Sequence, residues 1–236
     1  MPDFRTRAVD AEWMDGEDVS QADFAACVTD LAVVNSLTLA RPPTLAFVAQ
    51  ALERAGGRPL TLLDVGFGAG DMLRAIRKLA DRRGAEMRLI GIDLNPRSLA
   101  AANDLTPSGM AIDYRVGDLF ALAEDEPIDL VISSLVTHHM TDDAEILRFI
   151  GWMERRAVCG WFINDLHRHR IAYHGFQLLA GAMRWHPFVR HDGPLSVARA
   201  FTRSDWQRML QEAGVAQAAR CTWHFPFRYC VTRWQA

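Results

Sequence analysis

The sequence has little cysteine and almost no excess of charge. Its four cysteines, Cys27, Cys159, Cys221 and Cys230, include no CxxC pair, so neither a zinc ribbon nor a disulfide framework is predicted. The formal net charge is only -3. A general nucleic-acid binder would need a surplus of positive charge to attract phosphates, so this class is excluded.

Long apolar runs are also lacking. None approaches the roughly 20 residues that a membrane-spanning helix needs, and the N-terminus lacks the basic-then-apolar pattern of a secretion signal. We therefore expect a cytoplasmic protein without a membrane span, either a monomer or a homodimer. Its 236 residues, 50% of them hydrophobic, are enough for one domain with a sizeable core.

Short apolar runs alternate with amphipathic helical segments along most of the chain. An acidic stretch that includes Glu12 and Asp15 comes first and is expected to be loose. The expected strands are 59–64, 87–93, 112–116, 128–133, 158–164, 215–223 and 226–234. The expected helices are 21–37, 43–55, 72–79, one from Pro96, 142–156, 171–188 and one from Thr202 to Gly214, with a loop at 191–201. Alternating strands and helices predict a parallel sheet with helices on both faces.

A glycine-rich loop, Asp64-Val65-Gly66-Phe67-Gly68-Ala69-Gly70, follows the first expected strand. Glycines let backbone N–H groups approach a ligand that any Cβ would hold away, and the next helix directs its N-terminus at negative groups. The GxGxG spacing differs from the GxGxxG of dinucleotide enzymes, and the preceding acid, Asp64, suits a ligand with an ammonium group. By itself the loop also fits a tight turn without a ligand.

Acidic residues end the next two expected strands. Asp93 can accept hydrogen bonds from both hydroxyls of a ribose, although it also fits a helix cap before Pro96. Asp118 can accept from the exocyclic amine of adenine while Leu119 packs against the ring, although this pair also fits a simple turn. Ligands bind at the carboxyl ends of parallel strands, so these positions together indicate one nucleotide site.

These motifs, in order along residues 58–165, resemble those of the class I S-adenosylmethionine-dependent methyltransferases. Leu63 to Gly70 is similar to their first motif, Ile92-Asp93-Leu94 to the second, Gly117-Asp118-Leu119 to the third and Asp129 to Ser134 to the fourth. The resemblance implies S-adenosylmethionine as cofactor. The cofactor contacts that it implies are Asp64, Gly66, Phe67, Gly68, Gly70, Asp93, Leu94, Asp118, Leu119, Ser133 and Ser134.

The resemblance also implies an architecture. It is an α/β fold of three α-β-α layers, Rossmann-like, around a seven-stranded, mainly parallel sheet with an antiparallel C-terminal strand. We expect one domain over residues 1–236, in which 1–57 form an N-terminal helical lid and 58–236 the cofactor-binding core.

The segment from Ser133 to Asp142 is similar to one found in quinone-biosynthesis-like and other small-molecule methyltransferases. We therefore expect a small aromatic, quinol-like or polyketide-like acceptor from secondary metabolism, methylated on oxygen. A phenol has a pKa near 10 and is mostly neutral at pH 7, so a nearby histidine would increase its reactive fraction.

Histidines follow the fourth and fifth expected strands. His139 and His167 are the candidate bases, and Asp165 would orient an imidazole or favour its charged form. The candidate substrate contacts are His138, Arg170, His191 and Arg199, of which Arg199 is the best candidate for an anion. Packing at a helix entry or a surface helix start would equally explain these histidines. His167, His169 and His174 do not converge on one face with carboxylates, so no metal is predicted.

Other functions fit parts of the sequence. One is C-methylation of a quinol or phenol, and another is a non-catalytic scaffold subunit that binds S-adenosylmethionine. An NAD(P)-dependent oxidoreductase is disfavoured by the GxGxG spacing and by the absence of an evident Tyr-x-x-x-Lys pair. Exocyclic-amine methyltransferases of nucleic acids carry Pro-Pro-aromatic after the fourth strand, where this chain has Ser134-Leu135-Val136.

Overall fold

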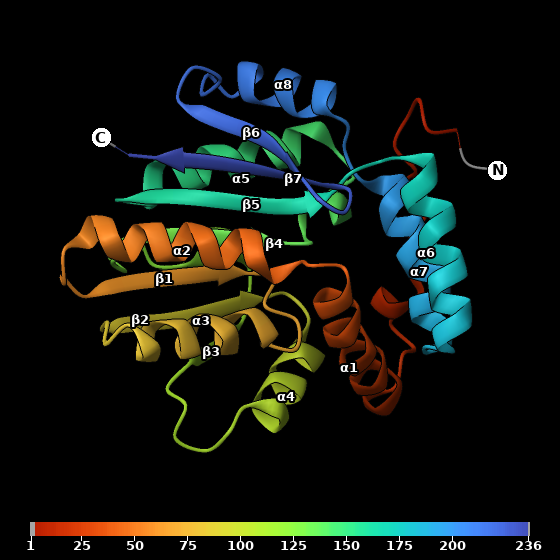
Figure 1. Ribbon diagram of the computed structural model, residues 1–236, viewed down its shortest axis with the longest axis horizontal. Helices are drawn as coiled ribbons and strands as arrows, with labels where there is room; N and C mark the ends of the chain where they lie inside the picture. The colour runs from red at the N-terminus through yellow and green to blue at the C-terminus, as the bar shows by residue number, and fades with distance from the viewer. Residues whose placement is uncertain (1–2, 236) are drawn as a thin grey trace.

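The computed structural model, which describes residues 3–235, has a central sheet with helices on both faces (Figure 1). The strand order is β3-β2-β1-β4-β5-β7-β6. All neighbours are parallel except that β7 runs antiparallel to both β5 and β6. The strands are β1 Leu60–Val65, β2 Met87–Asp93, β3 Asp113–Val116, β4 Leu130–Ser134, β5 Gly160–Leu166, β6 Ala219–His224 and β7 Arg228–Trp234. The predicted fold class is confirmed, including its antiparallel strand.

The central strands are almost continuously apolar because both of their faces are covered. On one face, Leu62 and Phe162 pack against α2 (Arg41–Ala55) and α3 (Asp71–Arg82). On the other, Val131 and Ile163 pack against α5 (Asp143–Arg156) and α8 (Arg203–Glu212). A smaller helix, α4 (Pro96–Leu105), packs near β2 and β3. Successive side chains of each strand point to opposite faces of the sheet, so the core forms two layers, one on each face.

Helix α2 belongs to the face of the sheet rather than to a cover over its edge. Its Phe47 ring lies 5.0 Å from the Phe162 ring and 4.4 Å from that of Trp234, stacked on both. Of the described residues 3–57, only the segment up to the end of α1 (Gln21–Leu37) lies across the carboxyl ends of the strands (Figure 1).

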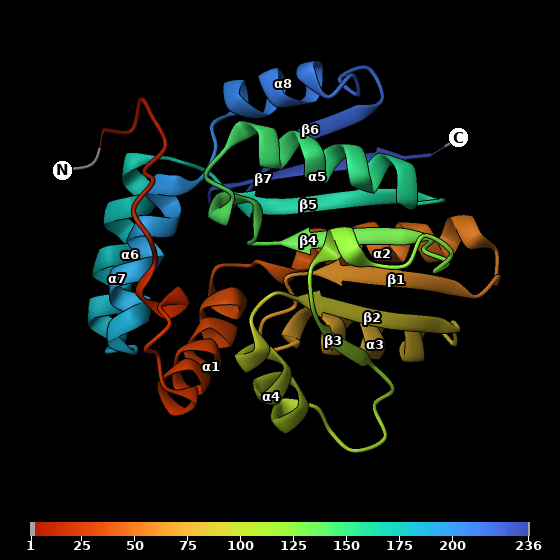
Figure 2. The same ribbon diagram turned by 180° about the vertical axis from the view of Figure 1, so that it is seen from behind.

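Two further helices, α6 (Arg170–Met183) and α7 (Pro187–Arg199), stand beside the same strand ends (Figure 1). The N-terminal segment runs along them and turns through the short 3-10 helix η1 (Trp13–Asp15) into α1 (Figure 2). Asp192 of α7 holds this turn, because its carboxylate accepts from the backbone N–H groups of Trp13 and Met14, both at 2.9 Å. The acidic N-terminal stretch was predicted to be loose, and that prediction is wrong from Glu12 onward.

The predicted loop at 191–201 is also wrong, because most of it forms α7. The predicted long helix 171–188 ends at Met183, where Arg184 adopts a left-handed conformation with φ 53°. Gly193 lies inside α7, where a Cβ would come 2.0 Å from Phe176 Cε1. This glycine serves the close approach of α6 and α7.

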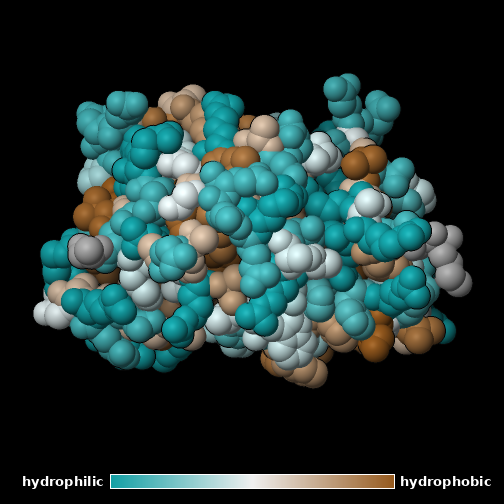
Figure 3. All heavy atoms as spheres, turned by 90° about the horizontal axis from the view of Figure 1, so that it is seen from above, coloured by the Kyte–Doolittle hydropathy of each residue, from teal (hydrophilic) through white to brown (hydrophobic). Residues whose placement is uncertain are grey.

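The face above α8 is mostly hydrophilic, with apolar side chains scattered over it (Figure 3). No single helix among residues 3–235 is both long and apolar enough to span a membrane, and only the bent pair of α1 and α2 together reaches that length and composition.

Candidate active site

A cavity of about 1120 Å³ lies at the carboxyl ends of the parallel strands. Its floor comes from the loops after β1, β2 and β4, and its walls come from α1, α6 and α7. The walls are mainly apolar and include Phe24, Val28, Leu31, Ile171, Phe176, Leu179, Val189 and Val197. Helices α1, α6 and α7 thus enclose a space next to the predicted cofactor motifs.

The three glycines of the loop adopt left-handed backbone conformations. Gly66, Gly68 and Gly70 have φ values of 74°, 53° and 73°, in the region where only glycine is comfortable. A Cβ on Gly66 would lie 2.3 Å from Val136 Cγ2, and one on Gly70 would lie 2.3 Å from the Tyr114 hydroxyl. Gly66, Phe67 and Gly68 line the cavity, whereas Gly70 caps α3 behind it.

Two carboxylates face the cavity from the floor. Asp64 is 2% exposed, and burial, with Asp71 and Asp93 nearby, raises the pKa of its carboxyl well above the usual value. Asp93 accepts from the backbone N–H groups of Gly68 and Asn95, both at 2.9 Å. Burial raises the pKa of Asp93 although these hydrogen bonds oppose it. A cationic or hydroxyl donor in the cavity would relieve the cost of burying both groups.

The remaining expected cofactor contacts divide into two groups. Leu94 and Ser134 line the cavity. Ser133 lies buried in β4, and Leu119 belongs to the core between β4 and α5. Asp118 caps the short 3-10 helix η2 (Leu119–Ala121) by accepting from Phe120 N at 2.9 Å. The cavity therefore does not reach the expected adenine contacts.

A fully buried carboxylate organises the histidines after β4. Asp165 accepts from the Thr137 hydroxyl, from His138 N at 3.0 Å and from Leu166 N at 2.7 Å, and its Oδ1 lies 2.7 Å from His138 Nδ1. Burial alone would raise the pKa of Asp165, but His138 and the hydrogen bonds lower it to about 2. Asp165 thus orients an imidazole, and that imidazole belongs to His138 in the 3-10 helix η3 (Thr137–His139).

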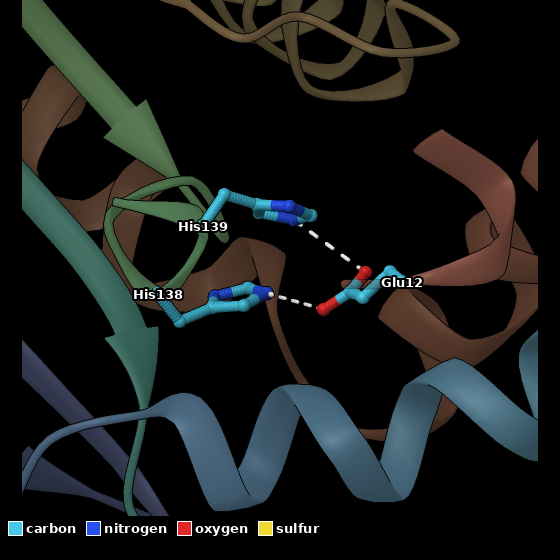
Figure 4. Close-up of side chains that lie close together, drawn as sticks. All are labelled: Glu12, His138 and His139. Carbon is cyan, nitrogen blue, oxygen red and sulfur yellow. Dashed lines mark ion pairs between the residues drawn. The ribbon is translucent and has the colours of Figure 1, made fainter. Parts of the chain in front are cut away.

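The N-terminal segment brings a further carboxylate to these histidines. Glu12 Oε1 lies 3.9 Å from His138 Nε2 and Glu12 Oε2 lies 3.8 Å from His139 Nε2, so the three side chains converge (Figure 4). His139 Nδ1 lies 3.2 Å from Asp15 Oδ2. Burial would lower the pKa of His139, but Asp15 and Glu12 outweigh it and raise the pKa. No sequence pattern pointed to Glu12 and Asp15, because only the fold brings the segment around η1 across the strand ends.

Arg199 was expected to contact an anion of the substrate, but its side chain does not line the cavity. It is 4% exposed and donates to the carbonyl oxygens of His138 at 3.1 Å, His139 at 2.9 Å and Asp10 at 3.0 Å. Arg7 assists by donating to Met140 O at 2.5 Å. Both guanidinium groups are used to hold the backbone of η3, and neither side chain lines the cavity.

Three other expected site residues also lie outside the cavity. The ring of His167 packs 4.7 Å from that of Tyr229, and its Nδ1 accepts from Trp223 Nε1 at 3.3 Å. Burial, with the charges of His169 and Arg168, lowers the pKa of His167 to about 4. Arg170 is exposed at the start of α6, and the His191 ring stacks on Trp13 at 3.7 Å. The structure brings His138 and His139 to the cavity and leaves His167 away from it.

Comparison with known proteins gives the motifs a family. Residues 63–151 match the family model described as a methyltransferase domain. The solved structure of the plantazolicin methyltransferase BpumL in complex with a monoazolic desmethylPZN analogue and SAH superimposes with a TM-score of 0.63 at 12% identity, covering 92% of this chain and 96% of that one. Residues 63–151 thus match a methyltransferase domain, and the chain has the fold of that solved methyltransferase. The prediction of this domain from the motifs is confirmed.

Curated relatives of the methyltransferase domain act on different atoms, by their names. A ubiquinone biosynthesis O-methyltransferase of Paramagnetospirillum magneticum is 28% identical over 161 residues, which are 66% of this chain and 59% of that protein. An indolepyruvate C-methyltransferase of Streptomyces griseus is 33% identical over 95 residues, which are 37% of this chain and 27% of that protein. The chain thus spans less than two thirds of the length of these relatives.

The matched residues of the methyltransferase domain cover only one side of the cavity. The glycine loop, Asp93 and the histidines of η3 lie within 63–151, whereas Glu12, α1, α6 and α7 lie outside that range. The walls that would contact an acceptor therefore come largely from residues outside the matched range.

Proposed function

We propose that the protein transfers a methyl group from S-adenosylmethionine to a small organic acceptor bound in the cavity. One observation carries the proposal: a single cavity is lined both by the glycine loop with Asp64 and Asp93 and by the apolar faces of α1, α6 and α7. Methyl transfer from a sulfonium is an in-line displacement, so alignment and exclusion of water supply most of the catalysis. A cavity that joins both sites supports that chemistry.

The floor of the cavity suits the charged half of the cofactor. The backbone from Gly66 to Gly68 allows close approach of a ligand, and the buried carboxylate of Asp64 would pair with the methionine ammonium. Asp93, already fixed by Gly68 N and Asn95 N, keeps acceptor capacity for ribose hydroxyls. The sulfonium would then face the histidines of η3.

The walls suit an acceptor with a flat apolar body and one ionisable hydroxyl. Aromatic and aliphatic side chains such as Phe24 and Phe176 would bury the body, and the polar end at Glu12, His138 and His139 would meet the hydroxyl. Loss of the hydroxyl proton makes a phenol, quinol or enol nucleophilic. We propose an aromatic, quinol-like or polyketide-like acceptor that is methylated on this oxygen. The alternative site is the carbon ortho to a phenolate oxygen or the α-carbon of an enolate.

Among the protein's own side chains, His138 is the group best placed to take that proton. Its Nδ1 is fixed on Asp165 at 2.7 Å, which directs Nε2 toward the cavity. A carboxylate that holds one ring nitrogen fixes the tautomer and stabilises the imidazolium that forms when the other nitrogen accepts a proton.

Cofactor titration and a turnover assay test the proposal. The purified protein is titrated with S-adenosylmethionine and with NAD(P), and release of S-adenosylhomocysteine is measured with a panel of phenols, quinols and polyketides. We expect binding of S-adenosylmethionine, and release of product with at least one acceptor. His138→Gln should lower turnover about 100-fold without changing cofactor affinity, while His174→Gln on the exposed side of α6 should change neither.

Other outcomes would contradict the proposal. Binding of NAD(P) without S-adenosylmethionine would assign the fold to an oxidoreductase. Binding of S-adenosylmethionine with no turnover on any acceptor would favour a scaffold subunit.

A further inference from the structure

We propose that Glu12, His138 and His139 bind one divalent transition-metal cation of the zinc type at the polar end of the cavity. Their ligand atoms, one from each residue, all lie within 4.8 Å of one another (Figure 4). Two imidazoles with one carboxylate form a ligand set that leaves coordination positions open. All three residues line the cavity, so these positions would be accessible to an acceptor.

The distances fit groups that surround an ion better than groups that bond to one another. The Glu12 oxygens lie 3.9 Å from His138 Nε2 and 3.8 Å from His139 Nε2, beyond hydrogen-bond length. A cation bound at roughly 2.1 Å to each ligand atom would place the atoms about 3.0 to 3.5 Å apart. The two printed distances would each have to shorten by about 0.3 to 0.9 Å to complete the site.

Each ligand is also held from behind. Asp165 fixes His138 Nδ1 at 2.7 Å, and Asp15 lies 3.2 Å from His139 Nδ1, so both Nε2 atoms can present a lone pair to an ion. Ser196 Oγ donates to Glu12 Oε1 at 2.8 Å and orients the carboxylate. Carboxylates behind the ligating histidines and a hydrogen bond on the ligating carboxylate are the supports that metal sites use.

The charges around the cluster favour a cation. Three carboxylates, those of Glu12, Asp15 and Asp165, lie next to the two imidazoles. Arg199 Nη1 approaches Glu12 Oε1 only at 3.9 Å, and its guanidinium is already used on backbone carbonyls. Glu12 and His138 are 4% and 3% exposed, so water screens this excess of negative charge poorly. Imidazole ligands select zinc-like ions over magnesium or calcium.

The chemical consequence rests on the proposed function, whereas binding of the ion does not. A hydroxyl of the acceptor in an open position of the ion would lose its proton to water more readily, because a bound cation lowers the pKa of an oxygen ligand by several units. The O–H electron pair stays on the acceptor oxygen, which then attacks the methyl carbon. The S–C pair goes to sulfur and leaves a neutral thioether. With the ion bound, both imidazoles act as ligands, and the ion replaces His138 in promoting proton loss.

Metal binding is measured on the full chain without an affinity tag, since a histidine tag would itself bind the ion. The protein is treated with chelator, dialysed and titrated with Zn²⁺ by calorimetry, and Co²⁺ is followed by its visible absorption. We expect one ion per chain and a visible spectrum typical of nitrogen and oxygen ligands. Glu12→Gln and His139→Ala should each weaken affinity at least 100-fold, and Ser196→Ala about 10-fold.

The matched control is His174→Ala, which removes an exposed imidazole from α6 and should leave affinity unchanged. Thermal unfolding and binding of S-adenosylhomocysteine show whether each variant is folded. Failure of the wild-type protein to bind Zn²⁺ would overturn the inference, and so would equal affinity in Glu12→Gln, His139→Ala and the wild type. The titration uses neither acceptor nor cofactor, so its result is independent of methyl transfer. Full turnover after removal of metal would overturn the role of the ion in proton loss while leaving the proposed function intact.

Discussion

Replacement of Asp165 by alanine should destabilise the protein strongly, because this carboxylate is the centre of the contacts around η3. It is 0% exposed and accepts from the Thr137 hydroxyl, His138 N and Leu166 N while contacting the His138 ring. Removing one member of a buried pair typically costs about 3 to 5 kcal/mol, because the remaining groups stay buried without a partner. In a chain of this size each 1 kcal/mol lowers Tm by about 2 to 4 °C, so Asp165→Ala should lower it by roughly 6 to 20 °C.

Urea unfolding followed by circular dichroism measures this loss of free energy of unfolding. Asp165→Asn retains one carbonyl acceptor and should lose less, about 1.5 to 3 kcal/mol. Asp118→Ala is the control, because Asp118 is exposed and accepts from Phe120 N; its loss should stay near 1 kcal/mol or below. If Asp165→Ala cost no more than Asp118→Ala, the assignment of Asp165 as the buried centre of η3 would be refuted.

Two further residues give predictions of different kinds. The pKa of His167 is lowered to about 4 from 6.5. Between these two values the imidazole is mostly protonated in the unfolded chain and mostly neutral in the folded one. The stability that neutral His167 contributes is therefore lost as the pH falls from about 6.5 to 4, with a slope of at most about 1.4 kcal/mol per pH unit; urea unfolding between pH 7 and pH 5 should show a smaller decrease in His167→Gln, and an identical decrease would contradict it. Arg199→Lys should lower the free energy of unfolding by about 2 to 4 kcal/mol, because an ammonium cannot reach all three carbonyls; Arg190→Lys, at an exposed position, should be neutral. A rise in the acceptor KM with unchanged stability would instead favour the anion contact expected from the sequence.

The sheet and the floor of the cavity could be predicted from the sequence because their signals are local. The apolar run Leu60–Val65 followed by glycines at GxGxG spacing defines a strand, a turn and a helix start within eleven residues, Leu60 to Gly70. The acids at 64 and 93 then fall at neighbouring strand ends, because β1 and β2 are parallel neighbours. Periodicity and topology together were sufficient for this part of the molecule.

The polar end of the cavity could not be predicted, because it is built from distant segments. Glu12 reaches His138 only after the N-terminal segment has packed along α7, as the hydrogen bond between Ser196 and Glu12 shows. Asp165 was expected to orient one of several imidazoles, and the choice depends on where β5 ends. His167 lies beyond that end in a bridge with Phe201, with its ring against Tyr229, which leaves His138 as the partner of Asp165.

The segment that forms α6 and α7 was predicted as one helix, 171–188, and a loop, 191–201, for a related reason. Gly193 and Pro194, residues of types that usually mark turns, lie within the predicted loop. Here the glycine is required by the ring of Phe176 on the neighbouring helix, a tertiary contact that no local pattern contains. Packing between α6 and α7 overrides the local preference.

Titration of S-adenosylmethionine into the wild-type protein and Asp93→Ala tests the central claim most directly. Asp93 faces the cavity beside the glycine loop, so loss of its hydrogen bonds to the cofactor should weaken binding by about 1.5 to 3 kcal/mol, or roughly 10- to 150-fold in Kd. Asp113→Ala, at the exposed start of β3, controls for the loss of a carboxylate. Thermal unfolding shows whether loss of the hydrogen bond that Asp93 accepts from Gly68 N destabilises the protein. Binding to the wild type and this loss in Asp93→Ala are the predicted results. Unchanged affinity in Asp93→Ala, or no binding of S-adenosylmethionine to the wild type, would contradict the account.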